Sequence, residues 1–202
     1  FVYISTTGVY GDHGGALVNE ATPVDPRADR SARRVAAEQA LHAWAARSGC
    51  TAIILRVPGI YGPGRLGIER IREQMPIVRE ADVGPGNRIH VDDLAACCAA
   101  ALAETVPAGI YNVGDGDHRT STWFTNEVAR QCELPPPPAI TMEQAEKEFS
   151  PMRLSFLRDR RTVDTTKMRD VLGVEPSYAN PVDGIHASIR EEGRGREASY
   201  RK

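Results

Sequence analysis

The run TAIILRV at residues 51–57 constrains the fold of this chain more than any other stretch. A short, predominantly apolar run of this kind is typical of a strand buried on both faces of a parallel sheet. Two further short runs, at residues 1–5 and 109–114, also predict strands. Stretches in which apolar residues recur with helical spacing lie between and after these runs. This alternation predicts an α/β fold with a mainly parallel sheet.

The longest predicted helix begins at Arg30 and ends at Gly49, with Asp29 as its candidate N-cap. The residues that can share its apolar face are Ala32, Val35, Ala36, Ala40, Trp44 and Ala45. A further strand is expected at 87–91, followed by a helix with Asp92 as its candidate N-cap. The remaining predicted helices cover residues 68–75, 92–104, 120–134, 141–149, 164–173 and 181–193.

Charge and composition exclude several classes of protein. The chain has 202 residues and a formal net charge of −2 with both signs interspersed, which does not favour a nucleic-acid or membrane surface. No apolar run approaches the roughly 20 residues of a membrane span. The four cysteines form no C-x-x-C pair, so we expect reduced thiols in a cytoplasmic protein and no metal site. Because the chain opens on Phe1 and directly on a strand, we expect it to begin inside a domain.

A literal G-x-G-x-x-G, GPGRLG, occupies residues 62–67. Glycines at this spacing can hold the pyrophosphate of a dinucleotide, and Glu80 and Asp82 lie near the distance expected for an acidic ribose-binding residue. Pro63 opposes this interpretation because it removes a backbone N–H from the loop, and the helix that follows is short. We therefore favour an ordinary loop at the carboxyl end of a strand.

Two other stretches carry polar groups that could form a site. STTGVYGD at residues 5–12 places hydroxyl groups at the carboxyl end of a strand, where open α/β sheets bind ligands. Hydroxyl groups that merely cap a turn are the alternative there. Arg30, Arg33 and Arg34 lie near a helix N-terminus, where the dipole favours anions. They mark either a functional site or a solvated charged face.

The stretch NRIHVDDLA has a structural interpretation. His90 alternates with Ile89 and Val91 on a short strand, and a lone histidine in that setting is expected to be structural. Asp92 and Asp93 then supply a cap and first-turn charge for the next helix.

In this order the motifs resemble those of the extended short-chain dehydrogenase/reductase family, the NAD-dependent epimerase/dehydratase group. The matching stretches are FVYISTTGVYGD, NEATPVDP, SARRVAAEQAL, ILRVPGIYGPGR, NRIHVDDLA, IYNVGDG and RTVDTTKMRDVLGVEPSY. The resemblance implies an α/β fold, the C-terminal part of a Rossmann-like doubly wound parallel sheet with a small α/β substrate-binding annex. It implies one partial domain over residues 1–202, with the annex built mainly from 62–90 and 135–180.

The resemblance also places GPGRLG in the loop after the family's sixth strand, near the nicotinamide and the substrate. The family's own glycine loop would precede Phe1, so we do not expect tight dinucleotide binding by this chain alone. In the intact protein the resemblance implies NAD or NADP as cofactor and a small-molecule substrate. It predicts cofactor contacts at Ser5, Thr6, Arg34, Val57, Pro58, Gly59 and Ile60. It predicts substrate contacts at Thr7, Tyr61, Arg65 and Arg88.

The candidate catalytic residues are Thr6, Arg30 and Arg34. Thr6 matches the family's catalytic Ser/Thr position. Counting back from Glu38 puts Arg34 at the family's Lys position and Arg30 at its Tyr position. A guanidinium stays protonated near pH 7, so Arg30 cannot replace the Tyr as general acid/base. The substitutes for the Tyr that the sequence offers are Tyr10, His13 and Tyr61.

The expected function is that of an NAD(P)-dependent oxidoreductase or epimerase/dehydratase acting on a sugar nucleotide or another small carbonyl or hydroxyl substrate. Gly59 and Gly86 stand where many sugar-nucleotide enzymes have Asn and some have a phosphate-binding Arg, which weakens the sugar-nucleotide assignment. A non-catalytic NAD(P)-binding sensor or scaffold is the alternative, and an inactive fragment is the third interpretation. The alanine-rich face at 32–45 permits a homodimer.

Overall fold

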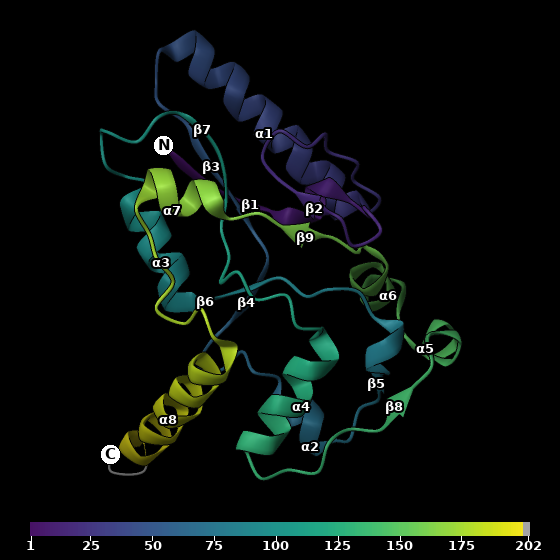
Figure 1. Ribbon diagram of the computed structural model, residues 1–202. Coiled ribbons are helices and arrows are strands. Elements are labelled where there is room, and N and C mark those ends of the chain that lie inside the picture. Colours follow the sequence, from purple (N-terminus) through teal and green to yellow (C-terminus); the bar gives the residue numbers. More distant parts are fainter. Residues whose placement is uncertain (200–202) are drawn as a thin grey trace.

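A three-stranded parallel sheet forms the centre of the computed structural model, which describes residues 1–199 (Figure 1). Its strands are β1 (Val2–Thr6), β3 (Ile53–Val57) and β7 (Gly109–Asn112), in the order β1-β3-β7. Ile53 pairs with Val2 on one side and with Gly109 on the other. Every residue of β3 is buried, as expected for the middle strand of a covered sheet. The predicted α/β fold with a parallel sheet is confirmed.

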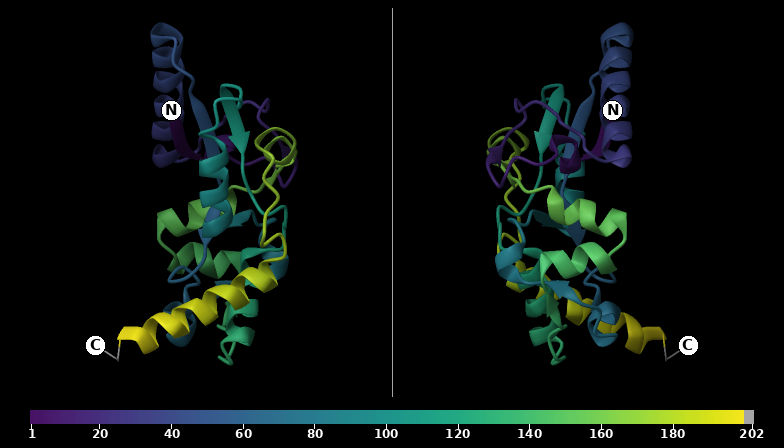
Figure 2. Two further views of the ribbon diagram at one scale, coloured as in Figure 1. Left: turned by 90° about the vertical axis from the view of Figure 1, so that its left-hand side faces the viewer. Right: turned by 90° about the vertical axis from the view of Figure 1, so that its right-hand side faces the viewer.

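Helices cover both faces of this sheet. Figure 2 shows α1 (Asp29–Ser48) on one side and α7 (Thr166–Leu172) on the other. On the α7 side, α3 (Val91–Ala100) adds Leu94 and Cys97 to a core that also contains Leu55, Tyr111 and Met168. The sheet therefore has the layered burial that holds its strand ends in fixed positions.

Helix α1 buries a different stripe from the one predicted. Ser31 and Glu38 are its buried residues, whereas the predicted core residues Ala32, Ala36, Ala40 and Trp44 are exposed. Periodicity failed here because a polar cluster beneath the helix takes the buried positions. The expected Asp29 cap is also wrong, since the N-cap is Ala28 without a side-chain hydrogen bond. The predicted stop is confirmed, because Gly49 ends the helix in the left-handed conformation.

Shorter elements complete the fold, many of them below the sheet in Figure 1. The strands are β2 (Leu17–Val18) paired with β9 (Thr162–Val163), β4 (Gly59–Tyr61) with β6 (Arg88–His90), and β5 (Ile77–Val78) with β8 (Ala139–Ile140). The α-helices are α2 (Ile68–Arg72), α4 (Ser121–Gln131), α5 (Met142–Glu148), α6 (Pro151–Arg158) and α8 (Pro181–Ser199). Two 3₁₀ turns are η1 (Thr7–Tyr10) and η2 (Glu80–Asp82).

Two of these elements correct the sequence predictions. Helix α6 was missed although it begins with Ser150 as N-cap and Pro151 in the first turn, both ordinary start signals. Helix α3 is capped by His90, whose Nδ1 accepts from the backbone N–H of Asp92, so the expected Asp92 cap is wrong. His90 is 1% exposed and its Nε2 contacts the Ser188 hydroxyl, which agrees with a structural histidine.

Within residues 1–199, none of the helices has the length and apolarity of a membrane span. The same part of the chain holds no group of three or more His, Cys, Asp or Glu side chains placed to bind a metal ion.

Candidate functional site

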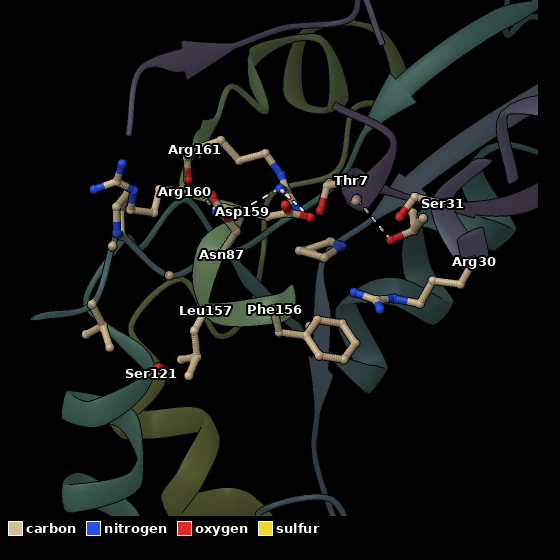
Figure 3. Close-up of a pocket in the computed structure, with 18 residues that line it drawn as sticks. Thr7, Arg30, Ser31, Asn87, Ser121, Phe156, Leu157, Asp159, Arg160 and Arg161 are labelled. Carbon is tan, nitrogen blue, oxygen red and sulfur yellow. Dashed lines mark hydrogen bonds and ion pairs between the residues drawn. The ribbon is translucent and has the colours of Figure 1, made fainter. Parts of the chain in front are cut away.

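An open cavity of about 330 Å³ lies at the carboxyl ends of β1 and β3 (Figure 3). Thr6 is the last residue of β1, and four other lining residues directly follow the two strands, namely Thr7, Gly8, Pro58 and Gly59. The opposite walls come from residues 83–87, from Ser121 at the start of α4, and from residues 156–161 around the end of α6. Carboxyl ends of parallel strands are where open α/β sheets place ligands, so this cavity is the candidate site.

Hydroxyl groups line the strand side of the cavity. Thr6 caps η1, and its Oγ1 accepts from the backbone N–H of Gly8 at 3.1 Å. That contact leaves the hydroxyl hydrogen of the half-buried Thr6 free to donate to a ligand. A Cβ at Gly8 would lie 3.1 Å from Ser31 Oγ, so the glycine lets α1 approach the strand end closely.

Arg30 reaches into the cavity from α1 and is held by α6. Its Nη1 donates to Ser155 Oγ at 2.7 Å, and its guanidinium lies 4.0 Å from the centroid of the Phe156 ring. Arg30 also borders a shallower hollow that it shares with Tyr3, Arg33 and Arg34. The structure therefore brings Thr6 and Arg30 to one cavity and joins that cavity to the neighbouring hollow through Arg30.

Arg34 lies in this second hollow and does not line the main cavity. Its Nη1 donates to Tyr3 Oη at 2.9 Å and to the carbonyl oxygen of Ile4 at 3.3 Å. Its guanidinium is thus fixed against β1, with its remaining N–H groups available to a ligand in the hollow.

Ser5 points away from the cavity into a buried polar cluster. Its hydroxyl donates to Glu38 Oε1, and Glu38 also pairs with Arg56, whose Nη2 lies 2.7 Å from Oε2. The Arg56 guanidinium in turn lies 4.8 Å from the Tyr10 ring centroid. This cluster joins α1, β1 and β3 behind the site and takes the Ser5 hydroxyl that was expected to contact the cofactor. Val57, another expected contact, is 3% exposed within the core, and Ile60 packs against that core.

A charged segment, residues 159–161, forms another wall of the cavity. Arg161 Nη1 lies 3.8 Å from Asp159 Oδ2 and also donates to the carbonyl oxygen of Gly11 at 2.8 Å. Burial raises the pKa of the Asp159 carboxyl, while the neighbouring Arg161 and Arg30 oppose that rise. Asn87 holds the segment from the far side, since its amide donates to the Arg161 carbonyl oxygen at 2.8 Å.

The GPGRLG loop is tied to α8 and packs against the start of α3. Gly64 already donates its backbone N–H to Glu192 of α8, and a Cβ at Gly62 would lie 2.6 Å from Val91 Cγ1. The helix that follows, α2, has only five residues. These features agree with the ordinary loop that the sequence favours. Arg65 of this loop lines a second cavity of about 380 Å³, which shares Ser121, Phe156 and Leu157 with the first.

Tyr61 and Arg88, two expected substrate contacts, are buried outside the main cavity. The Tyr61 hydroxyl has no hydrogen-bond partner among the described residues, and burial raises its pKa. Arg88 pairs with Asp117 at 3.0 Å and donates to the carbonyl oxygen of Arg119. A Cβ at Gly86 would collide with that same carbonyl oxygen and with the Arg88 guanidinium. Gly86 and Arg88 therefore pack closely against each other in this region.

A family model described as NAD dependent epimerase/dehydratase family matches residues 1–114. The chain belongs to this family. It is 25% identical over 208 residues to the dTDP-glucose 4,6-dehydratase of Streptomyces niveus, a match that covers 94% of this chain and 56% of that protein. The chain spans about half the length of the curated relatives it matches.

Solved structures of the epimerase/dehydratase type have the same fold. The Thermus thermophilus UDP-glucose 4-epimerase, solved with NAD, superposes with a TM-score of 0.76 at 25% identity, covering 96% of this chain and 63% of that one. A conserved protein of unknown function from Silicibacter pomeroyi gives a TM-score of 0.82 at 36% identity, covering 94% of this chain and 65% of that one. These matches agree with the predicted Rossmann-like sheet.

The three substitutes expected for the tyrosine of the epimerase/dehydratase family do not line the cavity. Tyr10 is fully buried and donates to Asn112 Oδ1 at 2.7 Å. His13 Nε2 contacts the carbonyl oxygen of Tyr10 at 3.0 Å, and Tyr61 is buried as described above. Sequence reasoning missed the lining residues Ser31, Asn87, Ser121, Phe156, Leu157, Asp159, Arg160 and Arg161. The start signals of α6 could have found the helix that carries Phe156 and Leu157, but no spacing rule links the others to Thr6.

Proposed function

We propose that the chain carries the substrate-facing part of an NAD(P)-dependent oxidoreductase or epimerase/dehydratase. The observation that supports this most directly is the cavity at the ends of β1 and β3, where Thr6 and Arg30 face the same space in a member of this family. The substrate would be a sugar nucleotide or another small molecule that interconverts a carbonyl and a hydroxyl.

The described residues fit the reactive end of a dinucleotide and not its pyrophosphate. Gly8 and Gly59 leave room along the strand ends, and the Thr6 hydroxyl faces that room. In contrast, the Gly64 N–H is already bound and α2 is too short to present a strong helix dipole to a phosphate. A nicotinamide bound at the strand ends would supply hydride exchange with a carbon of the substrate.

The residues of the chain would bind and orient around that end. Thr6 would donate a hydrogen bond to the substrate oxygen, and Arg34 would donate to ribose hydroxyls from the hollow that it shares with Tyr3. Arg30, between the two hollows, would fix a carbonyl or anionic group. The annex drawn from residues 62–90 and 135–180 would enclose the substrate, since residues 83–87 and 156–161 form the facing walls.

A non-catalytic NAD(P)-binding sensor or scaffold is the second candidate. It is favoured by Arg30 and Arg34 standing where the family resemblance places Tyr and Lys. Neither guanidinium can take part in proton transfer near pH 7. The same cavity could then bind the cofactor end without turning a substrate over.

A titration of the intact protein with NADH and NADPH, followed by nicotinamide fluorescence, tests the proposal. Turnover is then measured on a panel of aldehydes, ketones and sugar nucleotides for the wild type, Thr6→Ala and Arg30→Ala. Loss of turnover at unchanged NADH affinity supports the enzyme. Binding without turnover anywhere on the panel supports the sensor, and no binding of either nucleotide rejects both. Arg47→Ala, an exposed arginine at the far end of α1, is the matched control.

A further inference from the structure

Interconversion of a carbonyl and a hydroxyl needs a group that gives and takes a proton beside the reacting oxygen. Tyr10, His13 and Tyr61 do not line the cavity, and a guanidinium such as that of Arg30 keeps its proton. A threonine hydroxyl such as that of Thr6 is too weak an acid to fill the role alone. The candidates for the proton-transfer group are therefore the other residues that line the cavity.

Asp159 is the one carboxylate on the cavity wall among the described residues, and the other ionisable lining groups are arginines. Its side chain is only 8% exposed. Neither carboxylate oxygen accepts a hydrogen bond from any group in the described part of the chain, apart from the looser 3.8 Å contact with Arg161. The carboxylate therefore keeps its acceptor capacity for a ligand in the cavity. Figure 3 shows it next to Thr7, with Arg161 reaching to it.

The backbone around Asp159 is held rigidly enough to position that carboxylate. The backbone N–H of Arg160 donates to Asp12 Oδ1 at 3.1 Å, and its carbonyl oxygen accepts from the N–H groups of His13 and Gly15. The loop that follows η1 thus clamps residues 159–161 to the end of β1. This contact fixes the acid relative to Thr6, the last residue of β1, and to Thr7, which follows it.

The charges around Asp159 suit a carboxyl that changes protonation during a reaction. Burial raises its pKa and Asp12 raises it further, while Arg161, Arg30 and Arg27 lower it. The net direction is upward from the ordinary value of an aspartate. A buried carboxyl with a raised pKa is a better proton donor near neutral pH than an exposed one.

We propose that Asp159 is the proton-transfer residue of this site and takes the role for which Arg30 is unfit. This rests on the proposed function. In the oxidative direction, a nicotinamide bound at the strand ends would accept the hydride as the substrate C–H bond breaks. The hydroxyl O–H bond breaks as its proton passes to the Asp159 carboxylate, and the C=O bond forms. The carboxyl then releases the proton to water at the open mouth of the cavity, and reduction runs through the same steps in reverse.

The test compares the wild type with Asp159→Asn and Asp159→Glu in the intact protein. Asparagine keeps the shape and removes the proton, and glutamate restores the acid one methylene further out. We expect Asp159→Asn to lower turnover on the substrate panel by about 10²- to 10⁴-fold at unchanged NADH affinity, with partial rescue in Asp159→Glu. Asp170→Asn, an exposed carboxylate on α7, should change neither quantity.

A readout independent of turnover is infrared difference spectroscopy of the carboxyl band during a pH titration. The wild type should show carboxyls that titrate above the ordinary aspartate range, that of Asp115 among them, and Asp159→Asn should lose one of these bands while that of Asp115 remains. Turnover of Asp159→Asn within threefold of the wild type would overturn the assignment and leave the proposed function intact. An intact wild type that binds neither NADH nor NADPH would instead overturn the proposed function, and the role of Asp159 with it.

Discussion

Glu38 and Arg56 form an ion pair with side chains only 4% exposed, behind the candidate site. Glu38→Gln would leave the Arg56 charge buried without its counter-ion, so we expect a loss of about 3–5 kcal/mol in the free energy of unfolding. Urea unfolding monitored by circular dichroism measures this loss. An exposed control, Glu104→Gln, should change stability by less than about 0.5 kcal/mol.

A double variant checks the cause of that loss. Glu38→Leu combined with Arg56→Met removes both charges and fills a similar volume, so much of the lost stability should return. If the double variant is as unstable as Glu38→Gln, packing around α1 and not the unpaired charge explains the effect.

Asp115 is a buried carboxyl whose pKa is raised to about 7 by burial. The folded state holds this proton more tightly than the unfolded chain does. Protonated Asp115 therefore contributes its whole stabilisation below the pKa of the unfolded chain, and this contribution is lost as the pH rises through 7. Asp115→Asn cannot ionise, so its stability relative to the wild type should increase by about 2 kcal/mol between pH 5 and pH 8. Thermal or urea unfolding at the two pH values measures the change. A stability difference between Asp115→Asn and the wild type that is the same at pH 5 and at pH 8 would contradict the raised pKa.

Helix α6 is the element that carries Phe156 and Leu157 into the cavity wall. Its N-cap is Ser150, whose hydroxyl accepts from the backbone N–H of Arg153 at 3.3 Å. Ser150→Ala should cost about 1 kcal/mol and speed amide hydrogen exchange over residues 151–158. Ser155→Ala, which removes the contact with Arg30 but keeps the cap, should leave that exchange unchanged.

The sequence predicted the elements of the fold that are long or strongly apolar and missed those defined by contact. β3 and the alternation of strands with helices are confirmed. A strand that is buried on both faces consists largely of apolar residues, so its own sequence is enough to predict it. The two-residue strands β2 and β9 form only because they pair with each other across more than a hundred residues of sequence. No local sequence pattern predicts them. Thr6 and Arg30 were predictable from their positions in motifs. Asp159 was not, since only the tertiary fold brings it to the end of β1.

At the scale of the whole molecule, the exposed face of α1 carries Ala36, Ala40 and Trp44, the last of them 40% exposed. Small side chains let two helices approach closely, so we expect two copies of the chain to associate through this face. Ala40→Glu should convert a dimer to a monomer in light scattering after gel filtration, because a carboxylate would be buried at the contact. Glu104→Gln is again the control. A wild type that is monomeric at high concentration would reject this expectation.

The close packing of Gly86 against Arg88 has a consequence for how this protein can change through evolution. Any side chain at position 86 collides with the Arg88 guanidinium and with the carbonyl oxygen of Arg119. Whether position 86 can accept a side chain therefore depends on the residue at position 88. Loss of Arg88 would remove only one of the two collisions, so the backbone at Arg119 must also move before a side chain at position 86 becomes tolerable. Sequences that retain Arg88 and Asp117 should consequently be found with glycine at position 86.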